Sequence, residues 1–297
     1  MKRSQLSFGD YIKNHQTNFN KFLMSSLKKK TDEQDEIIKA ARYSLSAGGK
    51  RLRPLLAIAT AEGLGKGFDD IKTFAVSLEM IHTYSLIHDD LPAMDNDVLR
   101  RGKPTCHVVF GEKVAFYAGL YLLESAFMTL IQNASNKNQR EAALAIADAA
   151  GVNGMIGGQM ADMSSTGSKP NTNAMRFIHT RKTGRLIAVS VHAVALWFGI
   201  DKNVHKILLK IGDKIGLAFQ IVDDILDVEQ TSRVLGKTTG KDSQQGKMTY
   251  PALFGIKESR VRVKRLYDEV ERLLGTIEGF YFNRLFELSG YIINRIN

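Results

Sequence analysis

The stretch SLIHDDLPAMDND (residues 85–97) places four aspartates and a histidine directly after an apolar segment of the chain. Carboxylates this close repel one another unless something positive lies between them. Asp89 and Asp95 are six residues apart and would not share a face of a straight helix. Pro92 lies between them and disfavours regular helix at the preceding residue, so a distorted turn could bring Asp95 back towards Asp89.

A second acidic run, DDILD, follows another apolar segment and holds Asp223, Asp224 and Asp227. Spacings of three and four residues place these carboxylates along one edge of a helix. Mg²⁺ resolves such crowding, because it prefers oxygen ligands and uses one or two protein carboxylates together with phosphate oxygens and water. Two such runs therefore favour a metal site over a solvated acidic surface.

His88 beside Asp89 also permits a different interpretation, a helical His-Asp metal phosphohydrolase. That interpretation leaves the second aspartate run and the basic stretches of the chain without a role.

Basic residues recur in short stretches: GGKRLRP, LRRGKPTCH, HTRKTGRL, LGKTTGKD and QQGKMTYP. In the first, Lys50, Arg51 and Arg53 follow two glycines, where exposed backbone N–H groups can add to phosphate binding. Arginine suits bidentate contact with phosphate, whereas lysine acts as a point charge. Together with the acidic runs, these stretches indicate two sites, one that binds a diphosphate through metal and one that binds it through cations alone.

Composition narrows the function classes. The 297 residues carry a formal net charge of +10, which suits nucleic acid, acidic lipid or phosphorylated small molecules. A nucleic-acid binder would owe that charge to one continuous basic face. The single cysteine, Cys106, excludes an intrachain disulfide and suits a reducing compartment. The N-terminus lacks the apolar run of a signal peptide, and residues 186–200 are too short to span a bilayer, so we expect a soluble, cytoplasmic protein.

Apolar residues recur mostly at helical spacing, so the elements that position these residues are expected to be helices. The pattern predicts an all-α protein with one domain over residues 1–297. Breaks fall at Gly-rich or polar stretches. The predicted helices cover about 8–27, 35–47, 54–64, 71–91, 112–132, 138–163, 174–198, 204–226, 250–273 and 277–295.

Seven stretches carry a family resemblance: GGKRLRP, HTYSLIHDDLPAMDNDVLRRGKPTCH, GGQMAD, IHTRKTGRLI, FQIVDDILDVE, LGKTTGKD and GKMTYPAL. In this order the chain closely resembles the bacterial short-chain trans-prenyl diphosphate synthases over about residues 37–295, and most closely the farnesyl diphosphate synthases. The resemblance implies an isoprenoid-synthase-type helical bundle with a deep central cavity, a homodimer, and two acidic helices that hold three Mg²⁺ ions on an allylic diphosphate.

The resemblance also implies a role for each matching residue. Asp89, Asp95 and Asp223 would be principal metal ligands, with Asp90, Asp224 and Asp227 as direct ligands or as residues that support the ligands. Catalysis on the allylic substrate would involve Arg100, Lys182, Thr183, Gln220, Lys237 and Lys247. The metal-free isopentenyl diphosphate site would consist of Lys50, Arg53, His82 and Arg101.

The implied reaction condenses isopentenyl diphosphate with dimethylallyl and then geranyl diphosphate, without nucleic acid or membrane insertion. Tyr84, five residues before Asp89, resembles a cavity floor that stops the product at fifteen carbons. A geranylgeranyl diphosphate synthase, a terpene cyclase and a non-catalytic prenyltransferase subunit are the alternatives, although such a subunit would be expected to lose one acidic run. Leu120 stands where the family usually has Asp, and we expect it to affect local hydrogen bonding rather than activity.

Overall fold

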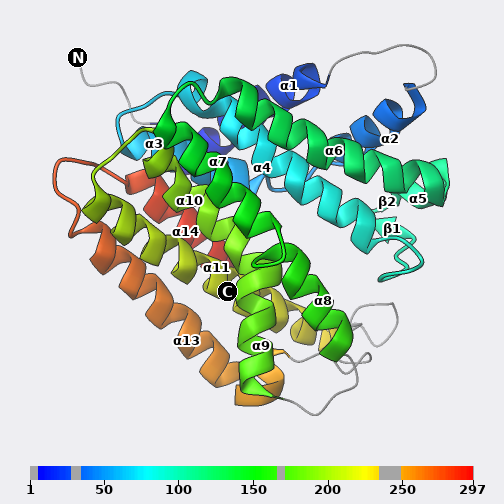
Figure 1. The fold of residues 1–297 in the computed structure, drawn as a ribbon. Helices are drawn as coiled ribbons and strands as arrows, with labels where there is room; N and C mark the ends of the chain where they lie inside the picture. The colour runs from blue at the N-terminus through cyan, green and yellow to red at the C-terminus, as the bar shows by residue number, and fades with distance from the viewer. Residues whose placement is uncertain (1–5, 28–34, 166–170, 234–248, 297) are drawn as a thin grey trace. The chain divides into compact units, whose positions relative to one another are not determined.

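The computed structural model describes residues 6–27, 35–165, 171–233 and 249–296 of the chain (Figure 1). The chain divides into two compact units. Unit 1 contains Met1–Ile58 and Lys66–Asn136, and unit 2 contains Ala59–Gly65 and Lys137–Asn297. The single domain over 1–297 stays a prediction.

Unit 1 is built around α4, which is apolar on nearly all sides and packs along α6. Its first turn carries Asp69 and Asp70, and the Asp70 carboxylate accepts a hydrogen bond from the Gly67 N–H, which stabilises the positive end of the helix. α3 begins in unit 1 and ends in unit 2. The helices of unit 1 are α1 (Phe8–Ser26), α2 (Asp35–Ser46), the first part of α3 (Leu52–Gly63), α4 (Phe68–Asp89), α5 (Cys106–Phe110) and α6 (Glu112–Asn133).

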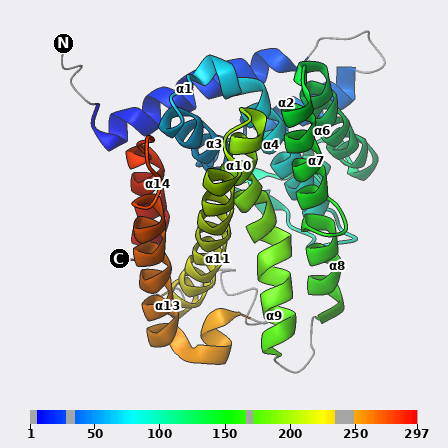
Figure 2. The same cartoon turned by 60° about the vertical axis from the view of Figure 1, so that its left-hand side comes forward.

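Unit 2 is built around α11, which packs against α10 and α13, and α14 packs against α13 (Figure 2). A Cβ at Gly212 would lie 2.7 Å from the Ala188 carbonyl oxygen, so glycine allows the close approach of α10 and α11. The helices of unit 2 are α7 (Lys137–Ala150), α8 (Met155–Ser165), α9 (Thr172–Ile178), the π-helix η2 (His179–Gly184), α10 (Arg185–Trp197), α11 (Lys202–Arg233), α13 (Tyr250–Leu274), α14 (Asn283–Ile293) and the 3₁₀-helix η3 (Asn294–Ile296).

The predicted all-α class is confirmed, and three local features differ from the periodicity. Residues 138–163 form two helices, α7 and α8, because Gly151 and Gly154 interrupt the pattern. Residues 174–198 contain the π-turn η2, and the last long helix begins at Asn283 rather than near 277.

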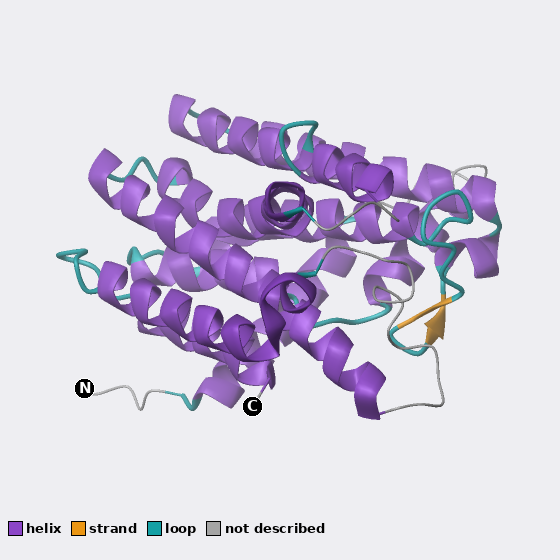
Figure 3. Ribbon diagram, turned by 90° about the horizontal axis from the view of Figure 1, so that it is seen from below, coloured by secondary structure: helices purple, strands orange, loops and turns teal. Residues whose placement is uncertain are grey.

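Among the described residues the only strands form one short hairpin, β1 (Leu99–Arg100) and β2 (Lys103–Pro104), drawn in orange in Figure 3. Its two turn residues, Arg101 and Gly102, have φ values of 54° and 74°. Positive φ at both central residues is typical of a tight two-residue hairpin turn. Helical periodicity did not predict this hairpin, which lies directly after the first acidic run.

Helix α6 is a second long apolar stretch besides residues 186–200. It is long and apolar enough to cross a membrane by length and composition, although core helices of soluble proteins pass the same test. The exposed apolar side chains of α6 are Phe116, Tyr117, Leu120, Met128 and Ile131.

Candidate active site

The first acidic run forms a tight turn at the end of α4. The helix ends at Asp89, and the Asp95 N–H donates a 2.8 Å hydrogen bond to the Asp89 carbonyl oxygen. The predicted return of Asp95 towards Asp89 is thereby confirmed at the backbone. Both side chains are half-buried.

The Asp90 carboxylate binds the guanidinium of Arg100. Arg100 Nε lies 2.9 Å from each Asp90 carboxylate oxygen, and Nη2 donates to Oδ1 at 2.6 Å. Asp90 is buried, and this burial raises the pKa of its carboxyl group, while the Arg100 hydrogen bond opposes the rise. Asp90 therefore fixes Arg100 beside the acidic run, 3.9 Å from Asp97.

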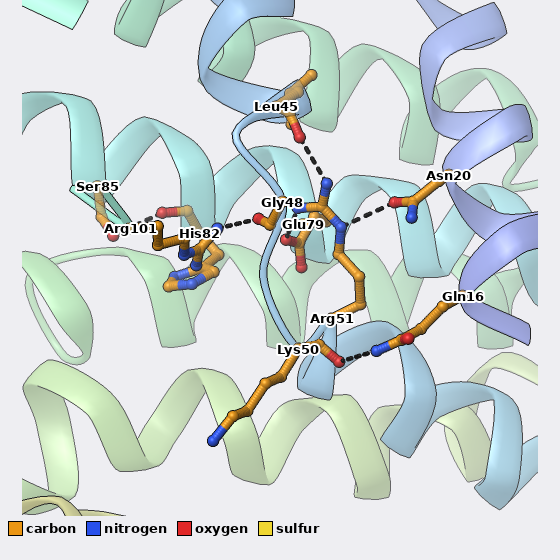
Figure 4. Close-up of polar contacts among 10 residues, drawn as sticks. All are labelled: Gln16, Asn20, Leu45, Gly48, Lys50, Arg51, Glu79, His82, Ser85 and Arg101. Carbon is orange, nitrogen blue, oxygen red and sulfur yellow. Dashed lines mark hydrogen bonds and ion pairs between the residues drawn. The ribbon is translucent and has the colours of Figure 1, made fainter. Parts of the chain in front are cut away.

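The hairpin also connects the acidic run to the basic turn between α2 and α3. Arg101 Nη1 donates a hydrogen bond to the Gly48 carbonyl oxygen. Figure 4 shows Arg101 beside His82 and close to this turn. The structure thus brings Arg101, His82 and the GGKRLRP stretch together within unit 1, as the resemblance implied for the isopentenyl diphosphate site.

His82 lies among arginines. Burial lowers the pKa of its imidazole well below the ordinary value, and the charges of Arg53, Arg101, Arg100 and Arg51 lower the pKa further. A neutral imidazole can donate one hydrogen bond to an anion without adding another charge to the cation cluster. Lys50 is exposed and Arg53 is buried.

Arg51 does not join the phosphate-binding cations suggested by the basic stretch. Its guanidinium is buried and contacts Glu79 at 2.6 Å, the Leu45 carbonyl oxygen at 2.5 Å and Asn20 Oδ1 at 2.9 Å. Figure 4 shows the Lys50 side chain pointing away from the Arg51 guanidinium. Neighbouring cations in this stretch therefore point in different directions.

Tyr84 lies one turn before the acidic run and is buried. Its ring meets that of His88 edge-on at 5.0 Å, and the His88 ring stacks on Phe116 of α6 at 5.2 Å. His88 Nε2 is also 3.0 Å from the Phe116 carbonyl oxygen. His88 is therefore engaged in a packing contact between α4 and α6, which gives no support to the phosphohydrolase interpretation.

In unit 2, Lys182 lies in the π-turn η2 and donates a 2.6 Å hydrogen bond to Asp162 of α8. A Cβ at Gly158 would collide with the Lys182 backbone, so glycine allows α8 to approach η2 closely. The matching stretch GGQMAD thus supplies both the close approach and the carboxylate. Thr183 is the next residue of the same π-turn and is half-buried.

Asp224 is buried and receives three contacts from protein groups. Gln220 Nε2 donates to its Oδ1 at 2.8 Å, the Tyr250 N–H donates to Oδ2 at 2.7 Å, and His179 Nε2 lies 3.5 Å from Oδ2. Asp224 therefore joins α11, η2 and the start of α13.

Asp223 points differently from its neighbour and forms a 2.7 Å ion pair with Arg295 of η3. Its side chain is 37% exposed, and Asp227 on the next turn of α11 is half-buried. Lys237 and Lys247 lie outside the described residues, so their place in the site stays a prediction.

Comparison with known proteins identifies the family. Residues 34–277 match the polyprenyl synthetase family. The chain belongs to this family. It is 45% identical to a farnesyl diphosphate synthase of Geobacillus stearothermophilus, over 80% of this chain and 81% of that protein. It is 42% identical to a geranylgeranyl diphosphate synthase of Cyanophora paradoxa, over 88% of each chain.

Solved structures of the polyprenyl synthetase family have the same fold. A crystal structure of an FPP/GFPP synthase from Zymomonas mobilis superposes with a TM-score of 0.85 at 31% identity, covering 96% of this chain and 98% of the other. The helical isoprenoid-synthase fold and the short-chain trans-prenyl diphosphate synthase class are thereby confirmed. Farnesyl and geranylgeranyl names occur together among the relatives, so they do not decide the product.

The family resemblance implies Mg²⁺, and the donor chemistry of both acidic runs fits this ion. Asp89, Asp95, Asp223 and Asp227 are half-buried carboxylate residues, and Asp223 is ion-paired with Arg295, whereas Asp90 and Asp224 are buried. Within the described residues, no group of three or more His, Cys, Asp or Glu side chains is already arranged as a ligand set. Carboxylate oxygens are ligands that Mg²⁺ prefers, and this ion usually keeps water and substrate oxygens as further ligands.

Sequence reasoning missed four supporting residues: Glu79, Asp162, His179 and Arg295. Asp162 stands inside a matching stretch, so its motif was a signal, but nothing in the sequence pairs it with Lys182. The partners of the other three residues lie further away in the chain, at separations of 28 residues or more. Asp89 belongs to unit 1 and Asp223 to unit 2, and their expected meeting across a central cavity stays a prediction.

Proposed function

We propose that this chain is a Mg²⁺-dependent farnesyl diphosphate synthase. In this proposal it condenses isopentenyl diphosphate with dimethylallyl diphosphate and then with geranyl diphosphate, in successive 1′-4 condensations.

The carboxylates of Asp89, Asp95, Asp223 and Asp227 would hold the metal and through it the allylic diphosphate. Bound Mg²⁺ supplies charge stabilisation for the diphosphate as negative charge develops on it. Arg100 and Lys182 add fixed positive charge for the same diphosphate, and the contacts with Asp90 and Asp162 support this role because they hold both cations in advance. Lys237 and Lys247 would complete this set by resemblance.

The developing allylic carbocation needs negative dipoles and protection from water. Gln220 donates its amide N–H to Asp224, which directs the amide oxygen away from that carboxylate. The oxygen dipoles of Gln220 and Thr183 would then face the cation. Water-excluding apolar helix faces would protect it until the isopentenyl double bond attacks and a proton passes to the departing diphosphate.

The isopentenyl diphosphate would bind to Lys50, Arg53, His82 and Arg101 without metal. The proximity of these residues within unit 1 supports this assignment, because the charges of Arg53 and Arg101 lower the pKa of His82. The diphosphate then meets three cations and one neutral donor.

The farnesyl product rests on one observation, the buried Tyr84 ring held edge-on against His88 five residues before Asp89. Five residues of helix correspond to about 7.5 Å, a depth at which an aromatic ring limits the length of a growing chain. The rival is a geranylgeranyl diphosphate synthase, for which a smaller or flexible residue would suit this position. A non-catalytic subunit is disfavoured because both acidic runs are intact.

A homodimer belongs to the same proposal. The outward side of α6 exposes Phe116, Tyr117, Met128 and Ile131, and Leu120 adds to it where the family usually has Asp. A second copy of the chain would cover this apolar surface. We also propose a cytoplasmic location without stable membrane insertion, supported by the single, buried Cys106.

One assay tests the proposal. Purified full-length protein is incubated with dimethylallyl diphosphate, isopentenyl diphosphate and Mg²⁺, and the products are sized by chromatography. A main product of fifteen carbons is expected. Twenty carbons would identify the geranylgeranyl rival, and no condensation under these conditions would favour the non-catalytic subunit.

A further inference from the structure

The N-terminal helix α1 contacts the basic turn that carries Lys50. Residues 8–26 lie outside the span that matches the polyprenyl synthetase family, which begins at residue 34. α1 packs against α2 and α4, with Phe19 and Leu23 fully buried. This packing makes α1 a fixed support rather than a loosely attached end.

Two amide side chains of α1 reach the turn. Gln16 Nε2 donates a 2.9 Å hydrogen bond to the Lys50 carbonyl oxygen, and Asn20 Oδ1 accepts one of 2.9 Å from Arg51 Nε (Figure 4). The two residues are four apart, so they lie on one face of the helix. One side chain acts as a donor and the other as an acceptor.

Gln16 holds the carbonyl oxygen of the peptide unit between Lys50 and Arg51. Asn20 holds the side chain of Arg51, the residue that follows this peptide unit. Arg51 has a φ of 50°, a left-handed conformation that is unfavourable for a residue with a Cβ. Such a conformation persists when surrounding contacts determine it, and here Asn20, Glu79 and the Leu45 carbonyl oxygen do so.

Rotation of this peptide unit would redirect the backbone at Lys50 and therefore its side chain. We infer that α1, through Gln16 and Asn20, is a positioning element for isopentenyl diphosphate, because it holds the Lys50–Arg51 peptide in the orientation that aims Lys50 at the diphosphate. The inference rests on the proposed function of the basic turn. Gln16 and Asn20 are positioning residues that act through Lys50 and Arg51.

The chain offers a matched test in substitutions on α1. Gln16→Glu keeps the shape of the side chain but removes the donor to Lys50. Asn20→Leu removes the acceptor for Arg51. Asn18→Asp places the same added charge on an exposed position of the same helix and serves as the control.

Steady-state kinetics are measured with each substrate varied in turn, together with the melting temperature of each variant. Gln16→Glu should raise the KM for isopentenyl diphosphate by about threefold to tenfold, the usual effect of one lost hydrogen bond. Asn20→Leu should raise the same KM, because Arg51 loses a contact that holds its side chain. Asn18→Asp should leave this KM within about twofold of wild type, and the KM for geranyl diphosphate should not change. Gln16→Met, which removes the donor without adding charge, should reproduce the rise.

Equal KM values for Gln16→Glu and Asn18→Asp would overturn the inference. So would a parallel rise for both substrates, because that result would indicate general destabilisation. Calorimetric titration of wild type, Gln16→Glu and Gln16→Met with isopentenyl diphosphate, without metal or allylic substrate, measures the same effect independently of turnover. A wild type that binds this ligand but does not condense it would refute the proposed function. The affinities of wild type, Gln16→Glu and Gln16→Met for this ligand would still test the role of α1.

Discussion

The Arg295 guanidinium forms a 2.7 Å ion pair with the Asp223 carboxylate. Asp223 is the residue of the second acidic run expected to hold metal, so a cation of the protein already neutralises part of its charge. Arg295 itself is held in place by neighbouring contacts, because its guanidinium lies 5.3 Å from the centre of the Phe219 ring and the adjacent Ile296 carbonyl oxygen accepts a hydrogen bond from Arg260. The ion pair and a divalent cation would compete for the same carboxylate.

Arg295→Gln should therefore increase the affinity of the substrate-free protein for Mg²⁺. Partly exposed ion pairs contribute about 0.2–1 kcal/mol, so the Mg²⁺ concentration that gives half of the thermal stabilisation should fall by about twofold to fivefold. The measurement is a thermal unfolding series over Mg²⁺ concentration. Arg284→Gln removes the partner of Glu287 instead and is the control. An unchanged or higher Mg²⁺ requirement in Arg295→Gln would refute the competition.

Asp162→Asn should lower kcat with little effect on the KM for isopentenyl diphosphate. Asp162 fixes the Lys182 ammonium at 2.6 Å, and a hydrogen bond between charged groups contributes about 1.5–3 kcal/mol, so we expect a loss of about tenfold or more. Glu141→Gln, which disrupts the exposed 3.8 Å pair with Lys137, should leave kcat unchanged. Equal kcat values in the two variants would show that Asp162 does not position Lys182.

Tyr84→Ala should lengthen the main product from fifteen to twenty carbons, because it removes the ring that packs on His88. Tyr84→Phe keeps the ring and should retain the fifteen-carbon product. Product sizing by chromatography distinguishes the two outcomes. Unchanged product from a folded Tyr84→Ala protein would mean that another residue limits chain length.

The double substitution Tyr117→Asp and Ile131→Asp should convert a dimer into a monomer. Both side chains are exposed on α6, 55% and 65% respectively, and charge on this surface would oppose its coverage by a second copy. Light scattering coupled to gel filtration measures the mass. Gln132→Asp adds charge to a neighbouring exposed position of the same helix and should remain dimeric. A double variant that keeps the wild-type mass would place the interface elsewhere.

Because of His192, the free energy of unfolding should be lower at acidic pH than at neutral pH. Burial lowers the pKa of His192 to about 3, with His205 and Arg185 contributing, and His205 lies 3.2 Å away. In the unfolded chain, the His192 imidazole binds a proton as the pH falls through about 6.5. In the folded chain, it binds that proton only near its lowered pKa of about 3. This contribution to the free energy of unfolding therefore decreases as the pH falls from about 6.5 towards 3, by up to about 1.4 kcal/mol per pH unit.

Urea denaturation between pH 7 and pH 4.5 checks this expectation. His192→Gln should show a shallower dependence of the free energy of unfolding on pH than wild type. Lys206→Gln, an exposed substitution near the start of α11, should keep the wild-type slope. Identical slopes for all three proteins would contradict the assignment to His192.

The sequence was sufficient to predict the helical class, both acidic runs and the turn that follows Asp89, because periodicity and the effect of Pro92 are local properties. It could not predict which distant groups each carboxylate of an adjacent pair contacts. Asp89 and Asp90 are neighbours with apolar residues around them, and the contact of Asp90 with Arg100 depends on the later turn of the chain. Asp223 pairs with Arg295, whereas Asp224 accepts hydrogen bonds from Gln220 and Tyr250.

The directions of the side chains in the basic turn between α2 and α3 could not be predicted from the sequence either. Lys50 and Arg51 are adjacent cations in an irregular segment, where no periodicity indicates the direction of a side chain. Their different directions follow from the left-handed backbone at Arg51 and from Glu79, which lies 28 residues further along the chain. Neither cause can be read from the residues of the turn itself.

The hairpin has a consequence for how product length can evolve. Arg100 and Arg101 are joined by one peptide bond, yet one contacts the acidic run and the other contacts the turn at Gly48. In the proposed function, this single turn therefore carries one cation for each diphosphate, and it is separate from the walls around the hydrocarbon tails. Substitutions that deepen or shorten the space for those tails can then accumulate without moving the two cations that hold the diphosphates. Enzymes with different products can therefore share the same catalytic residues.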